Sequence, residues 1–316
     1  MTGRVHGGPG AQGAACYDFS TNANACGPCP QALAAVQGAD ALRYPDPAST
    51  RVREALAAFH GVAVERIVPA ASASEMIFRL TAWAARSGVR QVALPRHSYG
   101  DYAQAARAWG LVPAADAALA WACEPSSPLG QGERDLHGAD GAIVVLDRAY
   151  EPLRLTGASS FSGAQCDAMW QLWSPNKALG LTGVRGAYAI APVAVDTAEA
   201  EAMAPSWPLG AHGEAMLLAW CESAVQQWLA ASRATLRNWK DRQQALCRDL
   251  GWSLQPSDAN FFVVQAPQLT AALPALRGQG VQLRDCASFG LRGHARLSVQ
   301  PPAAQDALAL AWRNAR

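Results

Sequence analysis

The middle of the chain alternates between short apolar runs and longer stretches whose apolar residues recur with helical spacing. The runs at residues 91–95, 141–147 and 186–192 are short and rich in aliphatic side chains, as buried strands are. Strands that alternate with helices form parallel sheets covered on both faces. The pattern therefore predicts an α/β protein built on a large, mostly parallel sheet.

A different pattern follows near the carboxyl end. Residues 213–250 are good helix formers with three tryptophans among the apolar positions, which predicts one long helix leaving the large sheet. Beyond it, residues 260–265 and 295–300 look like strands set among helical segments. We expect a smaller α+β domain there.

These patterns divide the chain into three parts. Residues 1–35 are rich in Gly, Asn, Pro and Cys and predict an irregular N-terminal arm that joins the small domain. Residues 36–205 form the large, ligand-binding domain. Residues 206–316 form the interdomain helix and the C-terminal small domain.

Composition narrows the classes of partner. The 316 residues are half hydrophobic and carry a net charge of +1, so there is neither a basic stripe for nucleic acid nor an acidic tail. No apolar segment is long enough to cross a membrane and no secretory signal opens the chain, so we expect a soluble, cytoplasmic protein. Small molecules are the expected partners, and no cluster of His and Cys has the spacing of a metal site.

The cysteines do not indicate redox chemistry. Eight cysteines scattered over a chain of this length are typical of reduced thiols rather than of a disulfide scaffold. Cys26-Gly-Pro-Cys29 has the letters of a thioredoxin pair. That chemistry needs a strand before the pair and a helix after it, whereas residues 21–25 are turn-like. We expect an ordinary loop.

Lysine is scarce in this sequence. Of the 26 basic residues only Lys177 and Lys240 are lysine, and the others are arginine. Arginine keeps its proton, whereas a lysine amine can lose its proton and attack a carbonyl. A lysine in such a chain suggests chemistry that arginine cannot perform.

Two motifs about 30 residues apart give Lys177 a chemical setting. The first is Val144-Val-Leu-Asp147-Arg-Ala-Tyr150, in which an acid stands at the carboxyl end of a predicted strand, where open α/β sheets bind ligands. The second is Ser174-Pro-Asn-Lys177, with Arg185 eight residues after the lysine.

Together these residues could hold a carbanion-stabilising cofactor. Such a cofactor needs an amine for an imine bond, an acid for its pyridine nitrogen, a donor for its ring oxygen and cations for its phosphate. Lys177, Asp147 and Tyr150 meet the first three needs, and Ser174 and Arg185 can bind phosphate through a hydroxyl and a bidentate fork.

The two motifs resemble those of the fold-type I enzymes that use pyridoxal 5'-phosphate (PLP), in which a strand ends Asp-x-x-Tyr and a later Ser-x-x-Lys is followed by Arg. The resemblance covers nearly the whole chain. It implies the aspartate aminotransferase fold, a large domain that binds PLP, and Lys177 as the residue that holds PLP as a Schiff base.

Within that family the sequence is most similar to the threonine-phosphate decarboxylases of cobalamin biosynthesis, and next to the histidinol-phosphate aminotransferases. The resemblance implies a homodimer in which Tyr44 reaches the cofactor phosphate of the partner subunit. It implies a phosphate cup at Ser72, Ala73 and Ser74, and an aromatic plate at Tyr99. It also implies substrate contacts at positions far apart in the chain: His6, Asn22, Arg284 and Arg296, the last as a carboxylate fork.

Two departures from the family pattern stand out. Where the family has Asn-Pro-x-Asn-Pro-Thr-Gly, this chain has Glu124-Pro-Ser-Ser-Pro-Leu-Gly130, so Ser127 stands where an asparagine donates to the ring oxygen of the cofactor. In the phosphate cup, residues 70–74 replace a Gly-Asn-Gly pattern. Neither change removes a charged cofactor contact.

Three functions follow from the resemblance. The first is decarboxylation of L-threonine O-3-phosphate to aminopropanol phosphate in cobalamin biosynthesis. The second is amino transfer to a 2-oxo acid from a histidinol-phosphate-like donor. The third is a PLP-binding homologue with reduced or no catalysis. For an amino acid bound to the cofactor, the bond that lies perpendicular to the cofactor ring decides between decarboxylation and amino transfer.

Overall fold

The protein was analysed as a computed structural model, which describes residues 7–11, 13–133 and 138–315. Its largest sheet has seven strands in the order β2-β8-β7-β6-β5-β3-β4. The order of its strands along the chain is β2 (Ile67–Ala70), β3 (Gln91–Ala93), β4 (Val112–Pro113), β5 (Leu119–Cys123), β6 (Ile143–Asp147), β7 (Trp170–Trp173) and β8 (Ala187–Ile190). Only β8 runs in the direction opposite to the other six strands, so the predicted mostly parallel sheet is confirmed.

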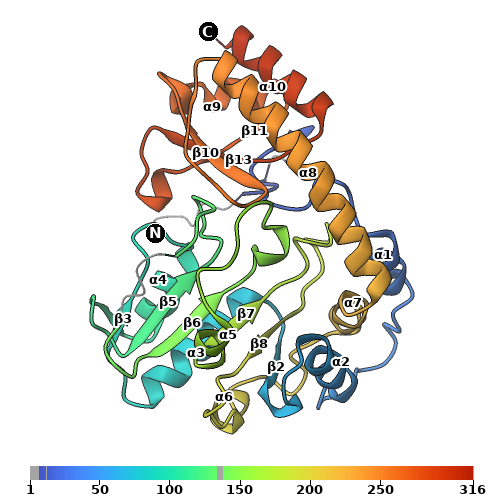
Figure 1. Cartoon of the computed structure of the whole chain (residues 1–316), viewed down its shortest axis with the longest axis vertical. Helices are drawn as coiled ribbons and strands as arrows, with labels where there is room; N and C mark the ends of the chain where they lie inside the picture. Colours follow the sequence, from blue (N-terminus) through green and yellow to red (C-terminus); the bar gives the residue numbers. More distant parts are fainter. Residues whose placement is uncertain (1–6, 12, 134–137, 316) are drawn as a thin grey trace.

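Helices cover both faces of this sheet (Figure 1). The neighbouring residues Ile67 and Val68 of β2 point to opposite faces and belong to two different hydrophobic clusters. One cluster includes α3 (Ala73–Arg86) and α4 (Gly100–Ala108); the other includes α1 (Pro30–Gln37), α2 (Thr50–His60) and α7 (Ala211–Trp220). The central strands are therefore apolar on both sides and lack polar alternation. Two short helices complete this part: α5 (Gly163–Asp167) and α6 (Ala198–Glu201).

The helix predicted over residues 213–250 is wrong in one respect, because it is two helices. After α7 the chain breaks at Cys221 and Glu222, where Glu222 has an extended backbone, and α8 (Ser223–Asp249) begins. Gln226 of α8 donates its side-chain amide to the Trp220 carbonyl, 2.6 Å away, and so caps the end of α7. The break lets α7 pack beside the large sheet while α8 runs to the small sheet (Figure 1).

The C-terminal part contains a second, four-stranded sheet in the order β12-β13-β10-β9. Its strands are β9 (Ser253–Leu254), β10 (Phe261–Gln265), β12 (Arg284–Asp285) and β13 (His294–Ser298), and its helices are α9 (Leu269–Gly278) and α10 (Pro302–Asn314). The two strands predicted here correspond to β10 and β13, which pair antiparallel. The arm reaches this part through β1 (Tyr17–Asp18), which pairs in parallel with β11 (Val281–Gln282).

The cysteines form no disulfide bonds, and all eight have free thiols. Within the described part of the chain, no helix combines the length and the apolar character that a membrane crossing requires.

Candidate active site

The carboxyl ends of the parallel strands carry the residues that the sequence singled out. Asp147 is the last residue of β6, and Ser174 follows β7 directly, with Lys177 in the turn after it. Because β6 and β7 are parallel neighbours, their carboxyl ends lie side by side. The acid and the lysine are thereby brought to one edge of the sheet.

The Lys177 turn is held by the N-terminal arm. The backbone N–H of Asn24 donates to the Lys177 carbonyl at 2.9 Å, and that of Cys29 donates to the Leu179 carbonyl at 2.8 Å. Gly180 has a φ of +67°, and a Cβ there would lie 2.5 Å from the carbonyl oxygen of Gly27. The Cys26-Gly-Pro-Cys29 loop thus packs on the lysine turn. Burial raises the pKa of the Cys26 thiol, which opposes a redox role.

Asp147 is a buried carboxylate with two hydrogen-bond donors. The Tyr102 hydroxyl donates to Oδ2 at 2.6 Å, and the backbone N–H of Ala149 donates to Oδ1 at 2.9 Å. Burial raises the pKa of Asp147, while Tyr102, Ala149 and nearby Lys177 act in the opposite direction. These contacts favour the ionised form, but burial outweighs them and leaves the pKa of Asp147 above its ordinary value.

Two tyrosines flank the lysine. The Lys177 Nζ lies 5.5 Å from the centroid of the Tyr150 ring, and that ring packs edge-on against Phe261 of the small sheet. The Tyr99 hydroxyl is 3.3 Å from the Ser74 Oγ, and burial raises its pKa. The Tyr99 phenol therefore stays protonated near neutral pH.

The amino end of α3 faces the same site. Ser72 caps this helix, its hydroxyl accepting from the backbone N–H of Glu75 at 3.1 Å. Arg185 is exposed at the cavity wall, and no described residue forms an ion pair or hydrogen bond with its side chain. A helix amino end and a cation next to a hydroxyl suit a phosphate.

Ten of the eleven predicted cofactor contacts line one cavity of about 130 Å³: Ser72, Ala73, Ser74, Tyr99, Ser127, Asp147, Tyr150, Ser174, Lys177 and Arg185. The eleventh, Tyr44, lies elsewhere. Its side chain is 79% exposed and stacks on Trp207, with ring centroids 4.5 Å apart. Within this chain the structure therefore does not bring Tyr44 to the cavity.

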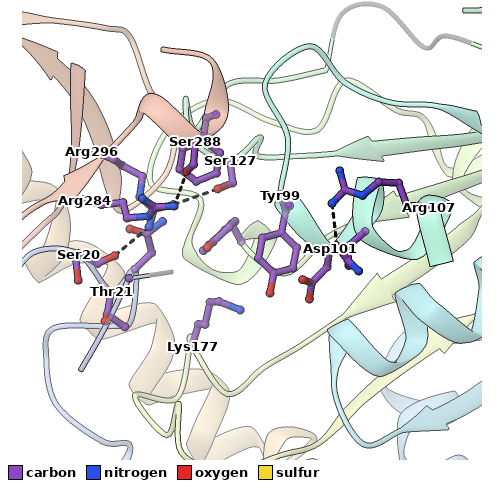
Figure 2. Close-up of a pocket in the computed structure, with 16 residues that line it drawn as sticks. Ser20, Thr21, Tyr99, Asp101, Arg107, Ser127, Lys177, Arg284, Ser288 and Arg296 are labelled. Carbon is purple, nitrogen blue, oxygen red and sulfur yellow. Dashed lines mark hydrogen bonds between the residues drawn. The ribbon is translucent and has the colours of Figure 1, made fainter. Parts of the chain in front are cut away.

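A second cavity, of about 490 Å³, opens beside the first and shares Lys177, Tyr99, Tyr150 and Ser127 with it. Three of the predicted substrate residues line it, namely Asn22, Arg284 and Arg296. Figure 2 shows the two arginines on one side of this cavity, with Asp101 and Arg107 of α4 on the other and Lys177 below. The fourth predicted residue, His6, lies outside the described residues.

The two arginines are held by different partners. Arg296 donates from Nη1 to the Ser127 Oγ at 3.1 Å and from Nη2 to the Ser20 carbonyl at 2.9 Å. Arg284 donates to the Ser288 hydroxyl at 2.7 Å, and burial lowers its pKa, with Arg296 adding to the effect. Two cations on one wall favour anionic groups of a ligand.

Several lining residues were not predicted from the sequence. Tyr102 stands one helical turn after Tyr99 in α4, and this spacing could have identified it. Asn176 accepts from the Ser174 hydroxyl at 2.9 Å. Asp101 lines the larger cavity, but nothing in its sequence context distinguishes it from a helix-capping acid.

The residues present fit PLP. A buried carboxylate, a lysine and two tyrosine rings surround the small cavity, and a cation with a helix amino end stands at its edge. The side-chain amide of Asn22 is 3% exposed, and neither of its polar atoms has a partner among the described residues. Buried polar atoms of this kind are normally satisfied, so a bound ligand is expected beside Asn22.

Comparisons with known proteins agree with this geometry. The profile of the family described as aminotransferase class I and II matches residues 14–117 and 135–311. Histidinol-phosphate aminotransferase 2 of Burkholderia mallei is 27% identical, over 96% of this chain and 94% of the relative.

Two solved structures share the fold. The histidinol-phosphate aminotransferase of Sinorhizobium meliloti, solved in complex with PLP, superposes with a TM-score of 0.81 at 20% identity, covering 99% of this chain and 95% of the other. The L-threonine-O-3-phosphate decarboxylase of Porphyromonas gingivalis has a TM-score of 0.72 at 20% identity, covering 89% and 91%.

Proposed function

The chain belongs to the aminotransferase class I and II family, and from this premise we propose that it is a PLP-dependent aminotransferase whose amino substrate carries a phosphate or second carboxylate. The observation that carries the proposal is the pair Arg284 and Arg296 on one wall of a cavity that also contains Lys177. A substrate with two anionic groups, or with one phosphate, meets these cations.

The cofactor is PLP, and each part of it has a counterpart in the small cavity. Lys177 Nζ would hold it covalently, and the Asp147 carboxylate would keep its ring nitrogen protonated. Tyr99 would stack on the ring and Tyr150 would donate to the ring oxygen. The phosphate would lie between the amino end of α3, Ser174 and Arg185.

The chain's own groups would then move one proton. When bound, PLP supplies an aldehyde and a ring that accepts an electron pair. Lys177 lines both cavities, so its Nζ would carry the proton removed from the substrate carbon. Arg296 would fix the orientation of the substrate, which decides which bond breaks.

Amino transfer is favoured over decarboxylation by one feature of the larger cavity. Asp101 of α4 lies opposite the arginines in Figure 2, and Gln104 of the same helix also lines the cavity. Both side chains would accept hydrogen bonds from a polar, nitrogen-bearing group such as an imidazole. A histidinol-phosphate-like donor has such a group, and the curated relative named above is a histidinol-phosphate aminotransferase.

Decarboxylation of L-threonine O-3-phosphate in cobalamin biosynthesis is the second candidate. The same two arginines would bind the carboxylate and the phosphate of that substrate, and one solved structure of the same fold is such a decarboxylase. A PLP-binding homologue without turnover is the remaining alternative, motivated by Ser127 and the altered phosphate cup.

A homodimer is part of the proposal. Tyr44, exposed and braced by Trp207, would project into the cofactor site of the partner subunit. Sedimentation velocity would test this, since a monomer at the concentrations used for activity excludes a shared site. A cytoplasmic location remains a prediction.

The activity test uses two substrates in parallel. Purified holoenzyme is mixed with L-histidinol phosphate and 2-oxoglutarate, or with L-threonine O-3-phosphate, and glutamate formation and CO2 release are measured. Amino transfer predicts glutamate in the first mixture and no CO2 in the second. CO2 from the second mixture selects the decarboxylase. If neither glutamate nor CO2 forms, the result supports the homologue without turnover.

A further inference from the structure

The loop between β5 and residue 130 has a construction of its own. It begins where the backbone N–H of Glu124 donates to the Asp147 carbonyl at 3.0 Å, and it ends at Gly130, whose carbonyl accepts from the Asp258 N–H at 2.6 Å. A Cβ at Gly130 would lie 2.1 Å from the Ser257 Oγ, so only glycine permits this approach. Backbone hydrogen bonds therefore link the loop both to Asp147 of the cofactor cavity and to Asp258, just before β10 of the small sheet.

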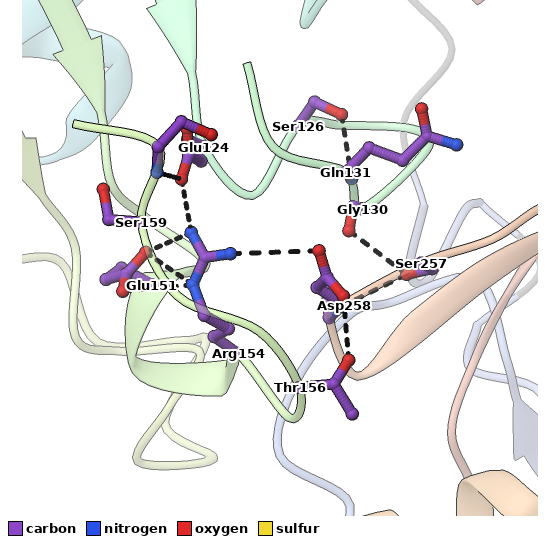
Figure 3. Close-up of polar contacts among 12 residues, drawn as sticks. Glu124, Ser126, Gly130, Gln131, Glu151, Arg154, Thr156, Ser159, Ser257 and Asp258 are labelled. Carbon is purple, nitrogen blue, oxygen red and sulfur yellow. Dashed lines mark hydrogen bonds and ion pairs between the residues drawn. The ribbon is translucent and has the colours of Figure 1, made fainter. Parts of the chain in front are cut away.

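A buried carboxylate holds the start of the loop. Glu124 is 1% exposed; its Oε1 accepts from Arg154 at 2.8 Å and from the Ser160 N–H at 2.7 Å. Arg154 also pairs with Glu151 at 2.8 Å and lies 4.0 Å from Asp258 (Figure 3). Charge-assisted hydrogen bonds are strong when they are buried away from water, so these contacts hold the start of the loop in one conformation.

Ser127 stands inside this braced loop and is 5% exposed, at the junction of the two cavities. Its hydroxyl accepts from Arg296 Nη1 at 3.1 Å, as Figure 2 shows. The hydroxyl has two acceptor lone pairs and one proton, so it can hold the guanidinium and still donate to a bound anion.

Arg296 is poorly restrained without Ser127. Among the described residues, its guanidinium forms hydrogen bonds only with Ser127 and the Ser20 carbonyl, and its Cζ lies 5.5 and 5.8 Å from the ring centroids of Phe261 and Phe289. Among the described residues no group accepts from its Nε. Losing the serine would leave Nη1 buried without a partner and would free a long side chain to rotate.

We propose that Ser127 is a positioning residue for the substrate: its hydroxyl orients Arg296 toward the α-carboxylate of an amino acid, rather than holding the cofactor. The sequence had suggested a cofactor contact, and this assignment moves the residue to the substrate side. It rests on the proposed function, because Arg296 must be the carboxylate fork.

The test compares ligands with and without the α-carboxylate. L-glutamate, the amino acid that the proposed amino transfer forms, and 4-aminobutanoate differ only by the α-carboxylate, and the dissociation constant of each from the holoenzyme is read from the cofactor absorbance. Ser127→Ala should weaken the first ligand about tenfold, the effect of one lost bond to a charged group. It should leave the second ligand within about twofold.

Two further variants separate positioning from folding. Ser127→Thr keeps the hydroxyl and should restore binding of L-glutamate. Ser126→Ala is the matched control, because that hydroxyl accepts from the Gln131 N–H within the same loop. The PLP dissociation constant, measured by tryptophan fluorescence, should be the same in all of these proteins.

Each contrary result overturns the assignment. If Ser127→Ala weakens PLP but not L-glutamate, the residue serves the cofactor. If Ser127→Ala weakens both ligands equally, Ser127 does not position Arg296 for the carboxylate. The proposed function fails separately, when PLP does not attach at Lys177.

Discussion

The hydrogen bond between Tyr102 and Asp147 offers a quantitative test of how the cofactor acid is held. Tyr102→Phe removes only the hydroxyl, because the ring is fully buried and stacks on Trp121 with centroids 4.9 Å apart. The hydroxyl donates to a buried, ionised carboxylate at 2.6 Å, and bonds to charged groups contribute about 1.5–3 kcal/mol. We therefore expect the apoprotein to lose about 2 kcal/mol of unfolding free energy near neutral pH.

The pH dependence of this loss has a definite sign. When the Tyr102 hydroxyl is removed, the pKa of Asp147 in the folded variant rises further above its value in the unfolded chain. The variant therefore loses stability as the pH rises from the unfolded pKa to the folded pKa. The deficit relative to the wild type should shrink in acid, where the carboxyl is protonated in both proteins.

The assay is urea unfolding of the apoprotein at several pH values, with Asp147→Asn as the second background. The charge-assisted bond no longer exists in that background, so Tyr102→Phe should cost clearly less there. A loss below about 0.5 kcal/mol in the wild-type background, or an equal loss in both, would refute the reasoning.

Three other outcomes follow from the same geometry. Arg185→Ala should weaken PLP about tenfold or more but leave pyridoxal, which lacks the phosphate, unchanged in fluorescence titrations; equal effects on both contradict the phosphate role. The pKa of His60 is lowered to about 4, mainly by burial and also by Arg148. As the pH falls from about 6.5 to about 4, His60 is therefore protonated in the unfolded chain but stays neutral in the folded chain. Stability should drop by up to about 3 kcal/mol over this window, and His60→Gln should flatten the profile in urea titrations. Gly180→Ala should lower the thermal midpoint by several degrees, because its Cβ meets Gly27, whereas Gly183→Ala, with open space around the Cβ, is the control.

The fold was largely predictable because its signals are local. Apolar runs gave the strands of both sheets, and the expected aspartate aminotransferase fold is confirmed. The break at Cys221 was not predictable, because no Gly or Pro marks it and it depends on a cap from Gln226. The domain limits at residues 35 and 205 stay predictions.

The candidate site was predictable where the residues lie close to motif positions at strand ends. Lys177, Asp147 and Tyr150 stand at short spacings after two neighbouring strands, so two short motifs identified all three. Contacts that close over long separations in the chain gave no such signal. The arm residue Asn24 on the Lys177 turn and the bond from Arg296 to Ser127 depend on the assembled tertiary structure.

The most direct test of the central claim is the identity of the amine that carries the cofactor. The chain has only two lysines, and Lys240 is buried, donating to the Ala259 carbonyl at 2.9 Å, with its pKa lowered to about 8 by burial. PLP-loaded protein is reduced with borohydride, and the labelled peptide is mapped by mass spectrometry, with Lys177→Ala and Lys240→Met in parallel. We predict label on Lys177 in the wild type and in Lys240→Met, and none in Lys177→Ala. Label at Lys240, or a covalent adduct in Lys177→Ala, would contradict the account.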